Sequence, residues 1–144
     1  MKKEVIILLV EDNEGDIVLT VEALREAKIH NKVMVVRDGE EALSYLYREG
    51  KYADAEMPDI IFLDINLPRI DGKEVLTKIK NDDRLKFIPV VILTTSDSEN
   101  DIMESYSNHA NCYITKPVDF NKFLQVVNMI KDFWITLVRL PTSN

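Results

Sequence analysis

The sequence predicts an α/β protein, a doubly wound sheet of five parallel strands flanked by five helices. Two observations carry this prediction. Short unbroken apolar runs bounded by turn residues recur along the chain, and such runs are typical of strands buried on both faces of a parallel sheet. Segments with apolar residues at helical spacing separate these runs. This alternation favours a parallel sheet with helices on both faces and right-handed crossovers.

The composition excludes several classes of protein. A chain of 144 residues suffices for one domain with a sizeable core. Its formal net charge of -7 and the lack of a basic run argue against direct binding of DNA. No apolar stretch reaches the roughly 20 residues that span a bilayer, and Val5–Val10 is too short for a signal peptide. A single cysteine, Cys112, fits a reducing compartment. We therefore expect a soluble, cytoplasmic domain.

The first part of the chain predicts two strands and two helices. Val5–Val10 is a buried strand, and a helix follows at about residues 14–27, with Asn13 as its N-cap. Lys32–Val36 is the second strand. The second helix has an apolar face made of Ala42, Leu43, Leu46 and Tyr47.

The middle of the chain continues the alternation. Arg48–Pro58 is polar and contains glycine and proline, so we expect a surface loop there. Ile60–Asp64 is the third strand, and it places Asp64 at its carboxyl end, where open α/β sheets carry their sites. The third helix is expected over Gly72–Asn81.

The last part of the chain supplies the remaining elements. Pro89–Leu93 is the fourth strand, and a hydroxyl-rich loop leads from it into a fourth helix at about Glu99–Ser107. Asn111–Ile114 is a short fifth strand. Phe120 opens the last helix.

Polar side chains gather where the predicted strands end. All carboxyl ends of a parallel sheet lie along one edge, so four polar clusters share it: Glu11 with Asp12, Asp64 with Asn66, Thr94 with Thr95, and Lys116. An aspartate that merely forms a turn after a strand would explain Asp64 alone. A helix cap would explain Glu11 or Asp12 alone. Neither explains the convergence.

The three carboxylates of Glu11, Asp12 and Asp64 would repel one another if left bare. A hard divalent cation would relieve that repulsion, and Mg²⁺ takes carboxylates, waters and a few further oxygens. The backbone carbonyl of Asn66 could supply one of those oxygens. The sequence therefore predicts a magnesium site at this edge.

The same edge is equipped for phosphoryl transfer. Lys116 provides a point charge for an anionic oxygen, and Thr94 a hydroxyl donor. A cis peptide bond between Lys116 and Pro117 would aim the lysine into the site. With a metal ion beside it, Asp64 would act as the nucleophile and form an acyl phosphate.

At these residues the chain resembles the receiver domains of two-component response regulators. The matching motifs are Val10–Asn13, Leu63–Gly72, Leu93–Ser96 and Tyr113–Pro117, and their order and spacing extend over nearly the whole chain. The resemblance implies a flavodoxin-like fold with strand order 2-1-3-4-5. It also implies a single receiver domain over residues 1–144, with an extended last helix, a short tail within 128–144 and no output domain.

The resemblance implies roles for the acidic residues. Asp64 corresponds to the phosphoacceptor, Glu11 and Asp12 to the magnesium-binding pair, and Asn66 to the residue that lends its backbone carbonyl. The family's more usual pair is two aspartates, so Glu11 is a mild departure. The phosphodonor of the family is a phosphohistidine on a sensor histidine kinase or a phosphotransfer protein. The chain would thus be a switch that catalyses only its own phosphorylation and dephosphorylation.

The resemblance also implies the residues that respond to phosphorylation. Thr94, with Thr95 beside it, corresponds to the switch hydroxyl, and Lys116 to the lysine that contacts the phosphate. Tyr113 falls where the family places an aromatic residue that turns inward on phosphorylation.

One stretch resembles a subfamily more closely. The run His109–Phe120, with Phe133-Trp134 and Leu140-Pro141 beyond it, is similar to the single-domain regulators that are paired with bacterial phytochromes. This similarity implies a light-sensing upstream kinase.

The last helix carries more apolar residues than one buried face needs. Such a surface usually meets a partner, although the extra residues could instead fold back on the domain. We expect a symmetric homodimer, because twofold pairing is the commonest oligomer and the resembling subfamily dimerises on this side. Its surface would include Phe120, Phe133, Trp134, Leu137 and Leu140.

Two other functions remain as alternatives on the same topology. An aspartyl-phosphate-forming hydrolase or phosphatase would need a second acid two residues after its nucleophile, where this chain has Asn66. A flavin-binding electron carrier would need a loop that cradles phosphate after the first strand, where Glu11 and Asp12 would repel it. His30, His109 and Cys112 are expected to be structural or solvent-exposed rather than reactive.

Overall fold

The computed structural model describes residues 4–26, 31–94 and 112–115, together with positions 121, 125 and 128; for residues 31, 94 and 112–115 it describes the backbone. The strands are β1 (Val5–Val10), β2 (Asn31–Val36), β3 (Ile60–Asp64), β4 (Val90–Thr94) and β5 (Cys112–Thr115). The helices are α1 (Glu14–Glu26), α2 (Gly39–Leu46), the 3-10 turn η1 (Gly50–Tyr52) and α3 (Gly72–Lys80).

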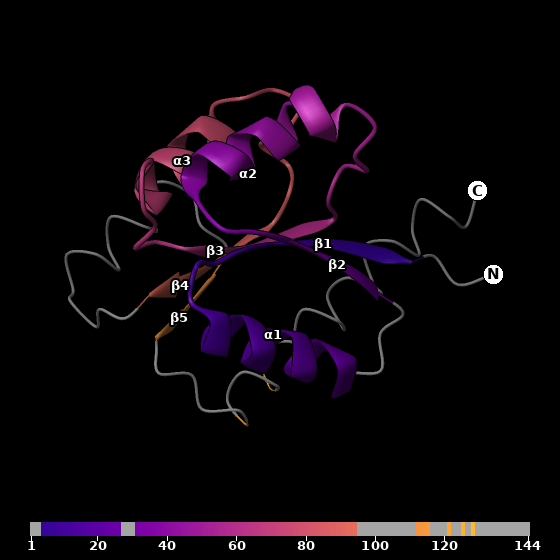
Figure 1. The fold of residues 1–144 in the computed structure, drawn as a ribbon, viewed down its shortest axis with the longest axis vertical. Coiled ribbons are helices and arrows are strands. Elements are labelled where there is room, and N and C mark those ends of the chain that lie inside the picture. The colour runs from indigo at the N-terminus through magenta and orange to yellow at the C-terminus, as the bar shows by residue number, and fades with distance from the viewer. Residues whose placement is uncertain are drawn as a thin grey trace.

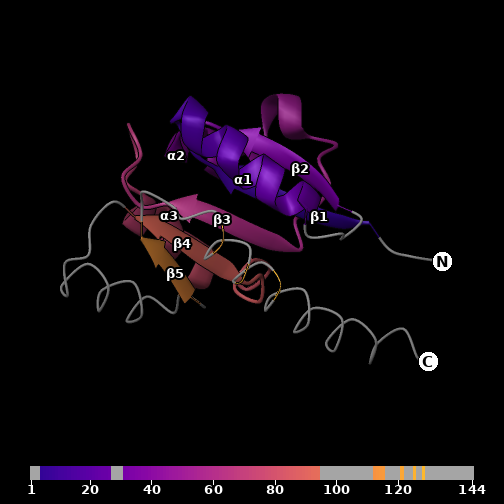
Figure 2. The same ribbon diagram turned by 90° about the horizontal axis from the view of Figure 1, so that it is seen from below.

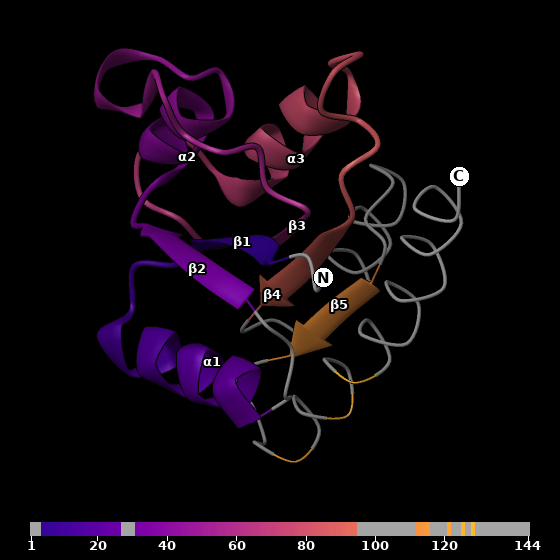
Figure 3. The ribbon, with the colours of Figure 1, turned by 90° about the vertical axis from the view of Figure 1, so that its right-hand side faces the viewer.

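The strands form one parallel sheet in the order β2-β1-β3-β4-β5 (Figure 2). Helices α2 and α3 cover one face of this sheet and α1 covers the other (Figure 1). The view turned about the vertical axis shows the same three layers (Figure 3). The predicted fold class and strand order are therefore confirmed.

Both faces of the central strands are buried, with a strict period of two. On β1, Leu8 and Val10 belong to the core under α2 and α3, whereas Ile7 and Leu9 belong to the core under α1. All six residues of β1 are buried, since each face of the strand meets a helical layer. This two-sided burial is why the strands read as unbroken apolar runs.

Each described α-helix begins with a polar side chain that caps its first turn. The Oδ1 atom of Asn13 accepts a hydrogen bond from the backbone N–H of Asp16 at 2.9 Å, which confirms the predicted N-cap of α1. Asp38 caps α2 and Asp71 caps α3 in the same way, each at 2.7 Å. These caps hold the first turns of the helices at the carboxyl edge of the sheet.

The expected loop at residues 48–58 contains a feature that the sequence reading missed. A 3-10 turn, η1, forms at Gly50–Tyr52, and Gly50 enters it with a φ of 57°. The Tyr52 ring lies 5.1 Å from the ring of Tyr45, measured between centroids. The predicted apolar face of α2 is confirmed, since Ala42, Leu43 and Leu46 are buried and Tyr47 packs partly buried against the same core. Tyr45, which was not predicted to belong to that face, is buried as well. One turn is too short to produce a helical hydrophobic period.

Several expectations fall on residues outside the described ranges. They are the fourth helix at 99–107, the cis peptide at Lys116-Pro117, and the last-helix surface of Phe120, Phe133, Trp134, Leu137 and Leu140; His30 and His109 also lie outside. Among the described residues, no helix combines the length and apolarity needed to cross a bilayer.

Candidate functional site

The register of β1 and β3 brings two predicted acids together. Val10 pairs with Leu63, so the next residue on each strand places Glu11 beside Asp64. Both continue the alternation of Leu9 and Phe62, which face α1. The sequence therefore folds the two carboxylates onto the same face at the same edge of the sheet.

Three carboxylates meet at this edge. One oxygen from each of Glu11, Asp12 and Asp64 lies within 4.8 Å of the other two. The side chain of Glu11 is 0% exposed and that of Asp64 is 3% exposed, whereas Asp12 is exposed to solvent. We call these three residues the acidic cluster. It has a buried floor and an open side through which a ligand can enter.

Backbone N–H groups hold the two buried carboxylates in place. The Oε2 atom of Glu11 accepts hydrogen bonds from the N–H groups of Asp12 at 3.1 Å and Asn13 at 3.2 Å, at the start of α1. The Oδ1 atom of Asp64 accepts from the N–H of Asn66 at 2.9 Å. These bonds orient the oxygens before a ligand arrives.

The acidic cluster fits a divalent cation. Burying one carboxylate is costly unless a positive partner offsets the charge, and here two are buried beside a third. Oxygen atoms gathered within 4.8 Å of one another can share one hard cation, and the exposed side leaves room for waters. Glu11, Asp12 and Asp64 would hold the ion. Their roles in metal binding and phosphoryl transfer stay predictions.

The remaining predicted site residues lie on β4 and β5 or outside the described ranges. In the backbone, Thr94 ends β4 and pairs with Thr115 of β5, and Tyr113 pairs with Ile92. The end of β4 therefore adjoins the carboxyl end of β3, where Asp64 pairs with Leu93. Thr95, Lys116 and Pro117 lie outside the described residues.

The loop between β3 and α3 links the acidic cluster to α2, which the sequence reading did not foresee. Arg69 has a φ of 67°, in the left-handed region. Its guanidinium lies 3.8 Å from a carboxylate oxygen of Asp38 and 3.3 Å from one of Glu40, both of which belong to the start of α2. No local periodicity signals such a contact.

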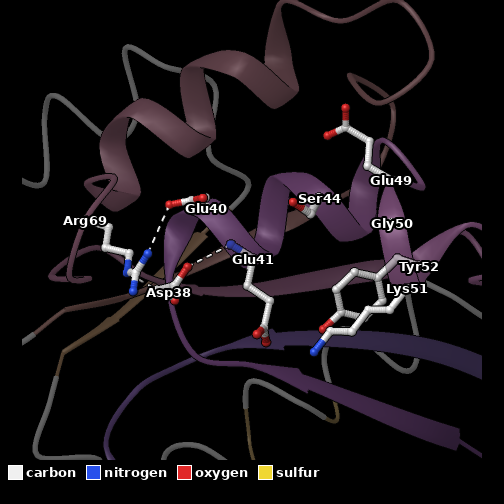
Figure 4. A pocket seen from close by; sticks show the side chains of 9 residues that line it. All are labelled: Asp38, Glu40, Glu41, Ser44, Glu49, Gly50, Lys51, Tyr52 and Arg69. Carbon is white, nitrogen blue, oxygen red and sulfur yellow. Dashed lines mark hydrogen bonds and ion pairs between the residues drawn. The ribbon is translucent and has the colours of Figure 1, made fainter.

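Arg69 also borders a polar pocket of about 330 Å³ beside α2 (Figure 4). The other lining residues come from α2 and the turn that follows it: Asp38, Glu40, Glu41, Ser44, Glu49, Gly50, Lys51 and Tyr52. None of them belongs to the acidic cluster. The pocket is therefore separate from the predicted chemistry.

Two relatives match the chain over most of their own length. Response regulator Rcp1 of Synechocystis sp. is 43% identical over 138 residues, which are 96% of this chain and 94% of Rcp1. The probable methanogenesis regulatory protein FilR2 of Methanothrix harundinacea is 42% identical over 136 residues, 94% of this chain and 87% of FilR2.

Solved structures agree with the sequence relatives. The crystal structure of the phosphorylated cyanobacterial phytochrome response regulator RcpA has a TM-score of 0.84 and 50% identity, covering 94% of this chain and 96% of RcpA. The Mn(2+)-bound form of Rcp1 has a TM-score of 0.80 and 43% identity, covering 90% and 93%.

The family of response regulator receiver domains matches residues 7–128, which include the acidic cluster and strands β2 to β5. Together with the relatives above, this match shows that the chain belongs to the response regulator receiver domain family.

Proposed function

We propose that Asp64 is the phosphoacceptor of this response regulator, and that Glu11 and Asp12 bind the Mg²⁺ that its phosphorylation requires. One observation carries the proposal: on a receiver fold, Asp64 ends the central strand β3 with two further carboxylates within 4.8 Å. Three carboxylates held close together at one edge suit a shared cation, because like charges at short range are otherwise costly.

Asp64 and Asn66 have different roles in the proposed phosphoryl transfer. A carboxylate oxygen of Asp64 forms a bond to phosphorus while the nitrogen–phosphorus bond of a donor phosphohistidine breaks, and the imidazole leaves with the electron pair. The N–H of Asn66 holds the other oxygen of Asp64 at 2.9 Å and so fixes the direction of attack. Bound Mg²⁺ supplies neutralisation of the charge on the phosphoryl oxygens.

Thr94 and Lys116 complete the proposed site from β4 and from the residue after β5. Lys116 would pair with one phosphoryl oxygen, and the hydroxyl of Thr94 would donate to another. Thr95 and Tyr113 would take part in the change that follows phosphorylation. The backbone position of Thr94, next to the end of β3, supports this assignment.

We infer that the phosphodonor is a sensor histidine kinase of the phytochrome type. The 50% identity to RcpA and the 43% identity to Rcp1 support this partner. FilR2, described by its connection to methanogenesis, is almost as similar, so the partner needs a direct test. Phosphotransfer from a bacterial phytochrome kinase should be faster than from a histidine kinase of another sensory class. Equal rates would contradict the light-sensing assignment.

We also propose a homodimer built on the last helix, in a cytoplasmic protein that does not itself bind DNA. Asn121, Gln125 and Asn128 are helical and exposed, at spacings of four and three that mark one polar face. Phe133, Trp134 and the other apolar residues of the expected surface lie outside the described residues, and their abundance in the sequence supports the proposal. Sedimentation should show a dimer that Trp134→Glu dissociates; a monomeric wild type at high concentration would refute it.

Acetyl phosphate with Mg²⁺ tests the phosphoacceptor directly. Intact-mass measurement should show one added phosphoryl group on the wild type and none in the presence of EDTA. If no phosphoryl group is added in the presence of Mg²⁺, the proposal is wrong. A hydrolase would instead turn over many equivalents of acetyl phosphate without a lasting adduct, so the phosphate released in the same sample separates the two functions.

A further inference from the structure

Two described helices begin with a glycine that follows an aspartate N-cap, Gly39 in α2 and Gly72 in α3. At both positions a side chain would collide with backbone. A Cβ on Gly39 would lie 2.3 Å from the carbonyl oxygen of Ile70, and a Cβ on Gly72 would lie 2.4 Å from the carbonyl oxygen of Asp64. The two glycines are thus alike in local structure and differ in what they touch.

Gly72 lies directly against the backbone that carries the phosphoacceptor. Its Cβ would also lie 2.6 Å from the Cα of Ile65 and 2.9 Å from the Ile65 carbonyl oxygen. That same oxygen accepts a hydrogen bond from the N–H of Gly72 at 3.1 Å. The start of α3 therefore packs against both peptides that follow Asp64.

Neither side of this contact has room to give way. The N–H of Ile65 donates to the carbonyl of Leu93 at 2.9 Å, which ties the strand end to β4. On the helix, Val75, Leu76 and Ile79 are 0% exposed in the core. An ordinary contact begins near 3.4 Å, so a methyl group at position 72 would force the Asp64 carbonyl away by about 1 Å.

We propose that Gly72 is a positioning residue for the metal site, because its missing side chain lets α3 hold Asp64 at the distance from Glu11 and Asp12 that one cation requires. The inference rests on the proposed function of the acidic cluster. Mg²⁺ demands near-ideal geometry from its oxygen ligands. A displacement of about 1 Å in a preorganised site can cost about two orders of magnitude in function.

The experiment compares Gly72→Ala with Gly39→Ala in the full chain, and its readout is Mn²⁺ affinity from the paramagnetic resonance signal of the free ion. Both variants introduce a similar collision, and thermal melts in EDTA measure what each costs in stability. Gly72→Ala should weaken Mn²⁺ binding by about tenfold or more, and Gly39→Ala should change it by less than about twofold. Equal Mn²⁺ affinities in the two variants would overturn the inference.

Mn²⁺ binding by the wild type distinguishes a failure of this inference from a failure of the proposed metal site. If the wild type binds no Mn²⁺, the proposed metal site is contradicted, and so is the role of Gly72. A wild type that binds Mn²⁺, beside a Gly72→Ala variant that binds it as well, leaves the site intact and overturns only the role of Gly72.

If the Gly72→Ala variant does not fold, a second measurement, made on the wild type, still tests the inference. Saturating Mg²⁺ should slow amide hydrogen exchange at Gly72, whose N–H donates to Ile65, because the ion rigidifies the strand end. The comparison amide is Ala42, whose N–H donates to Asp38 in the first turn of α2. Exchange at Gly72 that is unchanged by Mg²⁺ would also overturn the inference.

Discussion

Replacing Asp64 with asparagine should stabilise the metal-free protein while weakening its affinity for metal. The substitution removes a negative charge but keeps the Oδ1 acceptor, so the hydrogen bond from the Asn66 N–H at 2.9 Å survives. The substitution reduces the repulsion between position 64 and the other two carboxylates of the acidic cluster. The variant therefore isolates electrostatics from structure.

The structure bounds the size of the effect. Two unit charges 4.8 Å apart repel by about 1 kcal/mol in water and by about 3.5 kcal/mol at an effective dielectric constant of 20. Glu11 and Asp64 are both buried, so their pair lies between these limits. We expect Asp64→Asn to raise the free energy of unfolding by about 1–3 kcal/mol in EDTA at neutral pH and low salt. The melting temperature should rise by about 3 °C per kcal/mol.

Asp59→Asn is the matched control. Asp59 precedes the same strand, and its Oδ2 atom accepts a hydrogen bond from the N–H of Ile6 at 2.8 Å. It lies at the opposite end of β3 and is not part of the acidic cluster. Asparagine can keep this bond too, so the control carries the same chemical change without the relief of repulsion.

The assay is urea denaturation of the wild type and both variants, first in EDTA and then in saturating Mg²⁺. Mg²⁺ should stabilise the wild type through ligand binding and the Asp64→Asn variant much less, so the order of their stabilities should reverse. The reasoning is refuted if Asp64→Asn is no more stable in EDTA than Asp59→Asn, because the three carboxylates would then not repel one another.

Two further predictions concern groups away from the acidic cluster. Burial, followed by the charge of Glu56, raises the pKa of Tyr45 above its ordinary value of 10.0, and its hydroxyl donates to the Glu56 carbonyl at 2.8 Å. The folded state thus keeps a proton that the unfolded state loses, so stability is full below pH 10 and falls as the pH rises through the folded pKa. Tyr45→Phe should cost about 1 kcal/mol at neutral pH and make this alkaline decline shallower in urea titrations at several pH values; an unchanged slope would contradict the assignment. Arg69 has a left-handed φ of 67°, and both Arg69→Gly and Arg69→Ala lose its ion pairs with Asp38 and Glu40, so Arg69→Gly should be more stable than Arg69→Ala by about 1 kcal/mol in the same titration; the reverse order would show that the backbone there is not strained.

Much of the fold and part of the site could be predicted from the sequence, because both depend on local periodicity. The unbroken apolar runs of β1 and β3 gave two buried strands, and parallel pairing then placed Glu11 beside Asp64. The cap at Asn13 was equally local. Such features follow from residues a few positions apart and from the rule that parallel strands end at one edge.

The features that the sequence did not reveal depend on contacts between distant segments. The ion pairs of Arg69 with Asp38 and Glu40 join residues about thirty positions apart. The contact of Gly72 with the Asp64 carbonyl arises from the path of a loop, and a glycine beside an aspartate looks like an ordinary turn in the sequence. The contact of the Tyr45 ring with Tyr52 was not foreseen either, because it involves the turn η1, which has no periodic signal.

The most direct test of the account is to map the phosphoryl group to a residue. Protein treated with acetyl phosphate and Mg²⁺ would be reduced with borohydride, which converts an aspartyl phosphate to homoserine, and then analysed by peptide mass spectrometry. The account predicts one modified residue, Asp64, and no modification when Mg²⁺ is withheld. Modification of Asp12, Asp59 or any other acid in place of Asp64 would contradict it.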